Sequence, residues 1–310
     1  MKVLVFGVGG VGGFVGAALA RSYKDTYLYA RNEAKRVIQT QGLRLDSKKL
    51  GNMVVHPTLV SDDAHELGKM DVIILACKGN RLEEVCHSIA PMITPSTVVI
   101  PLLNGVLLSD VLEKYLPPCI VADGTIRIFS HIVSPGHIIQ EAGLCDIYFG
   151  MKDGRRVPIF YDIARILQEA GIRTTVVDDI VLQSWKKFAI TGTMGAIFCY
   201  YKGDTAFVRS QVGYETVVEK AHQEVVDVAK VYGVTIPPEF IATLIQTFHT
   251  MPGTTITSLY RDLLDGKDPR DTELDILLGD LVRKGKSVGV DTPIFEKAYN
   301  NFRHQSSEKR

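Results

Sequence analysis

Residues 2–23 read KVLVFGVGGVGGFVGAALARSY, and this stretch decides the fold class expected for the first half of the chain. Its first five residues, KVLVF, have the β-branched and aromatic composition of a strand, and its last ten, FVGAALARSY, form a plausible helix. Between them, Gly7, Gly9 and Gly12 fit the pattern G-x-G-x-x-G. A strand, such a loop and a helix in this order predict the first unit of a Rossmann-like fold.

The three glycines have different physical tasks in such a loop. The first permits a tight turn, the second lets the backbone approach a pyrophosphate, and the third lets helix and strand pack closely. The N–H groups and the positive dipole at the helix start then face the phosphates. A flexible glycine-rich loop is the alternative, but the flanking strand and helix favour a dinucleotide site. The cofactor-binding residues expected there are Gly7, Val8, Gly9, Gly10, Val11 and Gly12.

Further strand-like runs follow, separated by helix-like segments. They are TYLYA (26–30), MDVIILA (70–76) and STVVIPL (96–102). This alternation predicts an α/β domain with a Rossmann-like, doubly wound parallel sheet. From about residue 119 the runs become short and closely spaced, which predicts an antiparallel extension of that sheet.

Helical patterns dominate from Asp179 onward. We therefore expect two domains: a Rossmann-like NADP-binding domain over residues 1–177 and an all-helical substrate and catalytic domain over residues 178–310. A chain of 310 residues also exceeds the length at which proteins usually keep a single hydrophobic core.

Composition argues against several classes of protein. The chain has 35 Lys and Arg against 35 Asp and Glu, so no net charge favours nucleic acid or an anionic membrane. The five cysteines are scattered without a C-x-x-C pair, which argues against a disulfide framework and a zinc site. Residues 3–20 carry no charge and so look like the apolar part of a signal peptide. Six of them are glycine, however, which is a poor composition for a helix in a membrane, so we favour the strand and loop of the fold. We expect a cytoplasmic protein.

The end of the second strand bears on the choice of cofactor. A site for NAD usually has Asp or Glu at this point, whereas this chain has Arg31 after Ala30. An arginine suits the 2′-phosphate of NADP(H), although a solvated surface arginine is the alternative. Lys78 and Asn104 also follow predicted parallel strands, at the sheet edge where ligands bind. Alternatively, Lys78 is a surface charge and Asn104-Gly105 a plain turn.

Lys187 is the first candidate for catalysis. It lies in a predicted helix over 179–201 whose second half is almost entirely apolar, and it shares a face with Thr191 and Gly195. A lysine that enters an apolar interior loses hydration and becomes a better proton donor. The alternative is a lysine whose stem alone is buried.

Glu273 is the second candidate. It precedes LDILLGDLV, whose apolar positions 274, 277, 278 and 281 predict an amphipathic helix. A glutamate in a first turn ordinarily complements the helix dipole. It could instead hold a lysine ammonium or a substrate hydroxyl.

Several of these motifs, in this order, resemble the ketopantoate reductase family (2-dehydropantoate 2-reductase) over almost the whole chain. They are VLVFGVGGVGG (3–13), ACKGN (76–80), LLNGV (102–106), SWKKFAITG (184–192), ITSLYRDLLDG (256–266) and DTELD (271–275). The resemblance implies a Rossmann-like domain and a helical domain around a cleft. It also implies NADPH-dependent reduction of 2-dehydropantoate to D-pantoate, a step towards pantothenate and coenzyme A.

The resemblance also implies roles for individual residues. Lys187 would be the general acid, and Glu273 would bind the substrate hydroxyl. Ser258 matches a serine that contacts the substrate carboxylate, and Asn104 an asparagine beside nicotinamide and substrate. Lys78 matches a lysine near the cofactor. Arg31 matches the arginine at the 2′-phosphate.

The chain departs from the family pattern at two places. Thr191 and Gly195 stand where the family commonly has asparagines; Thr191 can still hydrogen-bond to substrate, whereas Gly195 offers no side chain. The spacing from Ser258 to Glu273 is also longer, with Gly266-Lys267-Asp268-Pro269 as the inserted segment. Both departures concern the substrate more than hydride transfer.

Three interpretations therefore stay open. The first is reduction of 2-dehydropantoate, the second is reduction of another 2-oxo acid or an imine on the same scaffold, and the third is a non-catalytic NADPH-binding sensor. The partner expected is a small 2-oxo acid rather than nucleic acid or membrane. Apolar helix faces could support a homodimer.

Overall fold

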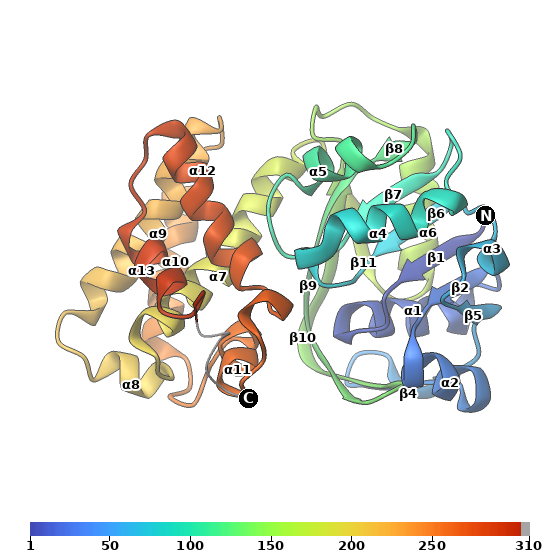
Figure 1. Cartoon of the computed structure of the whole chain (residues 1–310), viewed down its shortest axis with the longest axis horizontal. Coiled ribbons are helices and arrows are strands. Elements are labelled where there is room, and N and C mark those ends of the chain that lie inside the picture. Colours follow the sequence, from blue (N-terminus) through green and yellow to red (C-terminus); the bar gives the residue numbers. More distant parts are fainter. Residues whose placement is uncertain (305–310) are drawn as a thin grey trace. The chain divides into compact units, whose positions relative to one another are not determined.

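The computed structural model describes residues 1–304, with the side chains of all of them except residues 80 and 142–144. It divides into two compact units (Figure 1). The first comprises Met1–Cys77, Arg81–Leu103 and Leu107–Ile180, and the second comprises Lys78–Asn80, Asn104–Val106 and Val181–Arg310. Two short segments that carry Lys78 and Asn104 thus belong to the helical unit. The functional division at residue 177 stays a prediction.

A six-stranded parallel sheet forms the centre of the first unit, which confirms the expected α/β class. Three neighbouring strands in the interior of the sheet are buried along their whole length, as in parallel sheets covered on both faces. The order is β5 (Leu59–Ser61), β2 (Thr26–Tyr29), β1 (Val3–Phe6), β6 (Val72–Leu75), β7 (Val98–Pro101) and β8 (Ile120–Val121).

The antiparallel strands form a second sheet rather than an extension of the first. The strands β9 (Asp123–Ser134) and β10 (His137–Gly150) pair antiparallel, as expected. However, β10 also pairs in parallel with β3 (Leu43–Ser47) and β11 (Arg173–Val176), and β3 pairs antiparallel with β4 (Gly51–Val55). This five-stranded sheet gathers strands from distant parts of the chain, so local spacing could not reveal it.

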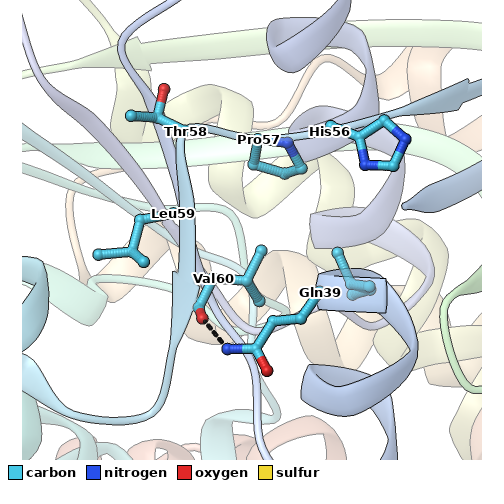
Figure 2. A pocket seen from close by; sticks show the side chains of 7 residues that line it. Gln39, His56, Pro57, Thr58, Leu59 and Val60 are labelled. Carbon is cyan, nitrogen blue, oxygen red and sulfur yellow. Dashed lines mark hydrogen bonds between the residues drawn. The ribbon is translucent and has the colours of Figure 1, made fainter. Parts of the chain in front are cut away.

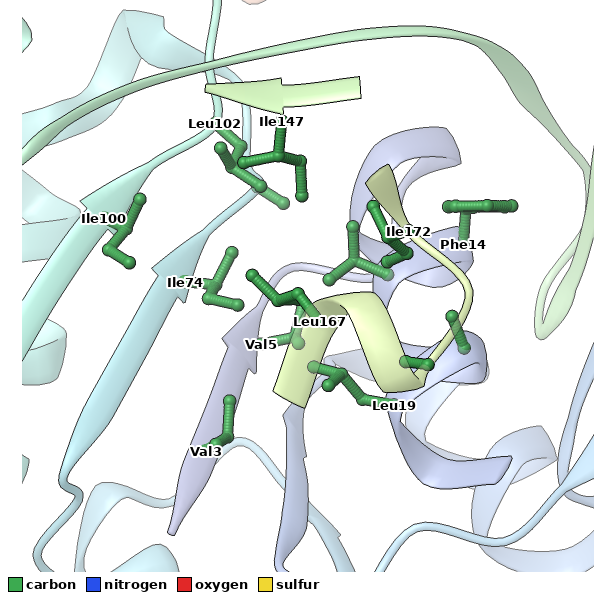
Figure 3. Close-up of a cluster of buried hydrophobic side chains, with 14 of the residues drawn as sticks. Val3, Val5, Phe14, Leu19, Ile74, Ile100, Leu102, Ile147, Leu167 and Ile172 are labelled. Atoms are coloured by element: carbon green, nitrogen blue, oxygen red, sulfur yellow. The ribbon is translucent and has the colours of Figure 1, made fainter. Parts of the chain in front are cut away.

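Helix α1 (Gly10–Ser22) lies between the two sheets of the first unit, since it contacts strands of both. Figure 3 shows the core around it, where Leu19 of α1 faces Val5 of the parallel sheet and Phe14 lies beside Ile172. The other helices of this unit are α2 (Asn32–Gln41), α3 (Ala64–Leu67), α4 (Leu82–Ile89), α5 (Leu108–Tyr115) and α6 (Pro158–Glu169).

The second unit is helical throughout the described part of residues 181–304. Its helices are α7 (Ile180–Tyr201), which begins one residue before it, α8 (Thr205–Arg209), α9 (Tyr214–Val231), α10 (Pro238–Thr250), α11 (Ser258–Leu264), α12 (Asp280–Val288) and α13 (Pro293–Asn300). The helix predicted over 179–201 is confirmed. No helix within residues 1–304 is both long and apolar enough to cross a membrane.

Candidate active site

The glycine loop joins β1 to α1 in the first unit. Gly7 has a φ of 97°, which ordinary residues rarely adopt. A Cβ on Gly12 would overlap the carbonyl oxygen of Gly7 and approach the side chain of Ala76. These two glycines are therefore required by the fold itself, for the turn and for close helix–strand packing.

Gly9 is different, because nothing inside the protein requires a glycine there. Its φ is −74°, and the nearest atom to an added Cβ is the carbonyl oxygen of Ala76 at 4.0 Å. It caps the N-terminus of α1 without a side chain, so the helix start stays open. Gly10, by contrast, packs on the backbone of Ser130 in β9. An open backbone at Gly9 suits the approach of a ligand.

Arg31 follows β2 at the same edge of the parallel sheet. Its guanidinium lies over the Tyr29 ring, 5.2 Å from the ring centre, and Nε donates to the Tyr29 hydroxyl at 3.3 Å. Tyr29 in turn stacks on Phe6 of β1. The arginine is exposed and partly fixed by these contacts. The edge therefore presents an oriented positive charge next to the strand that leads into the glycine loop.

A shallow pocket also lies in this unit, but at the wrong edge for a nucleotide. It is lined by Ile38 and Gln39 of α2 and by residues 56–60 (Figure 2). Gln39 Nε2 donates to the Val60 carbonyl at 2.8 Å. Because β5 runs parallel to β2 and starts at Leu59, this pocket lies near the amino ends of the strands, away from Arg31. Ligands of such sheets bind at the carboxyl ends.

In the second unit, Asn104 and Glu273 form a direct pair although they lie 169 positions apart in the sequence. Asn104 Nδ2 donates to both carboxylate oxygens of Glu273, at 3.0 Å each. Burial raises the pKa of the Glu273 carboxyl, while the Asn104 hydrogen bond and the charges of Lys187 and Lys78 act in the opposite direction. Two lysine ammonium groups thus lie within electrostatic reach of one half-buried carboxyl.

Lys187 lies on α7 and is only 7% exposed. One turn later the Thr191 hydroxyl donates to the Lys187 carbonyl at 3.1 Å, which leaves its oxygen able to accept a hydrogen bond. Another turn on, Gly195 is buried, and a Cβ there would touch the side chains of Leu259 and Leu278 at 3.4 Å each. The face that begins with Lys187 therefore becomes apolar at Gly195.

Lys78 is held from two sides. Its Nζ donates to Asp262 Oδ2 at 3.1 Å and to the backbone carbonyl of Asp271 at 3.1 Å. Asp262 belongs to α11, and its other carboxylate oxygen accepts from Lys267. Sequence reasoning placed Lys78 at the site but missed both Asp262 and Lys267. The only sequence feature that could have pointed to Asp262 was its place in the motif SLYRD, residues 258–262.

Ser258 lies in the helical unit but makes no hydrogen bond to Asn104, Glu273 or Lys78 in the part of the chain that the structure describes. It is the first residue of α11 and is exposed, and its hydroxyl has no hydrogen-bond partner within the described residues. Its neighbour Leu259 reaches Gly195. The segment after Glu273 also differs from expectation: Asp275–Gly279 forms a π-helical turn before α12 begins. Such turns are rare and occur frequently at functional sites.

Comparison with protein families identifies the chain over most of its length. A model described as ketopantoate reductase PanE/ApbA matches residues 3–154, and its C-terminal counterpart matches residues 179–306. The chain belongs to the ketopantoate reductase family. The resemblance noted in the sequence is thereby confirmed, and the protein is an oxidoreductase of this family.

Individual relatives carry different names. The uncharacterized oxidoreductase YkpB of Bacillus subtilis is 28% identical over 313 residues, covering 100% of both chains. The 2-dehydropantoate 2-reductase of Archaeoglobus fulgidus is 27% identical and covers 97% of each chain. Among solved structures, D-mandelate dehydrogenase with NADH and anilino(oxo)acetate superimposes with a TM-score of 0.84 at 25% identity, covering 97% of each chain. Ketopantoate reductase relatives thus include more than one named activity.

Proposed function

We propose that this ketopantoate reductase family member reduces the ketone of 2-dehydropantoate to D-pantoate with NADPH. The observation that carries the proposal is the group formed by Lys187, Glu273 and Asn104 in the helical unit. It combines a buried lysine, a carboxyl whose pKa is raised, and an amide that fixes that carboxyl. These are the groups needed to protonate an alkoxide and to bind a hydroxyl.

The glycine loop and Arg31 would hold the dinucleotide. Gly9, which the fold does not require to be glycine, supports close approach of a pyrophosphate to the start of α1. Arg31 would pair with the 2′-phosphate of NADPH. When bound, NADPH supplies the hydride.

The remaining steps belong to side chains of the helical unit. Lys187 donates the proton that the reduced ketone oxygen requires. Glu273 accepts a hydrogen bond from the substrate hydroxyl, and Asn104 keeps its carboxylate in one orientation. Thr191 offers an acceptor one turn beyond Lys187, and exposed Ser258 would meet the substrate carboxylate.

Reduction of a different 2-oxo acid is the second candidate, and Gly195 favours it. Leucine side chains border this position, so no polar group is offered to a substrate there. The likeness to D-mandelate dehydrogenase points to 2-oxo acids with an apolar substituent. We place either activity in the cytoplasm.

A substrate panel tests the proposal. Purified protein is mixed with NADPH or NADH and with 2-dehydropantoate, pyruvate or phenylglyoxylate, and cofactor oxidation is followed by absorbance. The highest kcat/KM for 2-dehydropantoate with NADPH is expected. A preference for phenylglyoxylate would favour the second candidate. NADPH binding without turnover of any compound would instead favour a nucleotide-binding sensor.

The two glycines that differ in packing give a separate prediction. Gly12→Ala should destabilise the fold by about 1–3 kcal/mol or more, because the new methyl group overlaps the Gly7 carbonyl. Gly9→Ala should leave the thermal unfolding temperature near that of the wild type but weaken NADPH binding. Calorimetric scans and NADPH titrations of both variants measure this. Unchanged NADPH affinity in Gly9→Ala would remove the assigned role of the loop.

Arg31→Ala should raise the KM for NADPH by about tenfold, the low end for a charge-assisted contact at an exposed site. The KM for NADH should stay within about twofold, since NADH lacks the 2′-phosphate. Arg36→Ala is the matched control, because Arg36 lies on α2 nearby and pairs with Glu33 instead. An equal rise for both cofactors would argue against recognition of the 2′-phosphate.

A further inference from the structure

Asp262 lies between two lysines, and one of them belongs to the inserted segment. Its Oδ2 accepts from Lys78 at 3.1 Å, while its Oδ1 accepts from Lys267. Asp262 is 21% exposed, whereas both lysine side chains are 48% exposed. One partly buried carboxylate therefore anchors two ammonium groups that remain accessible to solvent.

The end of α11 explains why Lys267 reaches this carboxylate. Gly266 has a φ of 76°, and its N–H donates to the Leu263 carbonyl at 3.1 Å. The Lys267 N–H donates to the Asp262 carbonyl at 3.1 Å. These two bonds form a Schellman motif, which brings the second residue after the helix cap beside the third-last helical residue. The backbone thus places Lys267 next to Asp262.

Lys78 is oriented by the same arrangement. An ammonium has three N–H donors. Within the described residues, Lys78 uses one on Asp262 and one on the Asp271 carbonyl, which leaves one for a ligand. Its positive charge also acts on Glu273, so the ammonium lies within electrostatic reach of the proposed catalytic group.

The charge of the three side chains is unbalanced. Burial raises the pKa of Asp262, but hydrogen bonds from Lys267 and Lys78 outweigh burial and lower it overall. Asp262 is therefore a carboxylate at neutral pH, and with two ammonium groups the set carries one net positive charge. Without Lys267 the set would be neutral, and Lys78 would be compensated fully by Asp262.

We propose that Asp262 and Lys267 are positioning residues that direct the third N–H of Lys78 to an anionic ligand oxygen. Asp262 fixes the orientation of the Lys78 ammonium. Lys267 supplies a second positive charge beside Asp262, so that the carboxylate does not neutralise Lys78 completely. The oxygen belongs to the carboxylate of a 2-oxo acid or to a phosphate of the dinucleotide. The inference rests on the proposed function for the identity of these ligands, but the lysine arrangement can be tested without either.

The first experiment measures the reactivity of Lys78 in the ligand-free protein. Trace acetylation with acetic anhydride, read by mass spectrometry, should be about twofold to fivefold slower at Lys78 in Lys267→Met, because Asp262 then holds Lys78 alone. It should be faster in Asp262→Asn. Lys267→Arg should match the wild type, as should Lys230→Met, which removes an exposed lysine of α9. A structural disturbance would speed labelling in both test variants, so changes of the same sign, or no change in Lys267→Met, overturn the proposal.

The second experiment identifies the ligand oxygen through steady-state kinetics. Lys267→Met should raise one KM by about twofold to fivefold with kcat within twofold of wild type, and added salt should reduce the difference. A raised KM for the 2-oxo acid assigns the carboxylate, and a raised KM for NADPH assigns the phosphate. If neither KM differs from that of Lys230→Met, the proposal is wrong. Absence of turnover in the wild type would refute the proposed function, whereas the labelling result would still decide this inference.

Discussion

Replacing Lys187 with alanine is expected to lower kcat by about 10²- to 10⁴-fold, the usual cost of losing a general acid. NADPH affinity should change little, because Lys187 lies on α7 in the helical unit and the glycine loop lies in the other. Single-turnover and steady-state NADPH oxidation measure the first effect, and NADPH titration measures the second.

Lys186→Ala is the matched control for this prediction. Lys186 is the adjacent residue on α7, but its ammonium lies over the Phe240 ring, 5.4 Å from the ring centre. Its loss should leave kcat within about twofold of wild type, as surface substitutions usually do. Equal losses in kcat and NADPH affinity for Lys187→Ala would mean that the substitution disturbs the fold rather than proton transfer.

Glu273→Gln is expected to lower kcat/KM by about 10- to 100-fold, the size of a lost hydrogen bond to a charged group. The glutamine keeps the shape of the side chain but loses the carboxylate, whose two oxygens both accept from Asn104 Nδ2. The control is Glu219→Gln, an exposed position on α9. That variant should behave like the wild type.

The same substitution should change the pH profile. Because burial raises the pKa of Glu273, protonation of this group begins at a higher pH than for an ordinary glutamate. The kcat/KM of the wild type should therefore fall as pH decreases through that raised pKa, and Glu273→Gln should lack this decline. Persistence of the decline in the variant would assign it to another group.

Much of the fold could be predicted because its signals are local. Strands β1, β6 and β7 are continuous apolar runs, β2 is rich in aromatic residues, and the second half of α7 is almost entirely apolar, so neighbouring residues alone indicate them. Strands β3 and β4 were missed because they are partly exposed and mix polar with apolar residues, and because β3 is completed by pairing with the distant β10. The π-helical turn after Glu273 keeps a helix-like apolar pattern, which hides its different hydrogen bonding.

The sequence could nominate the candidate residues but not the contacts between them. The motifs around Lys78, Asn104, Lys187 and Glu273 could be read one at a time. The pairing of Asn104 with Glu273 depends on segments that the fold brings together from 169 residues apart. Asp262 and Lys267 were not singled out because an aspartate and a lysine near a helix end are ordinarily solvated. Their contact with Lys78 also depends on a distant segment.

The contrast between Gly12 and Arg31 has a consequence for how this enzyme could change over evolution. Gly12 is enclosed by the Gly7 carbonyl and Ala76, whereas Arg31 stands at the surface on an aromatic ring. If Arg31 binds the 2′-phosphate as proposed, a substitution at this one exposed position can change the preferred dinucleotide without disturbing the fold. Substitution of Gly12 instead destabilises the fold, because a Cβ there overlaps the Gly7 carbonyl.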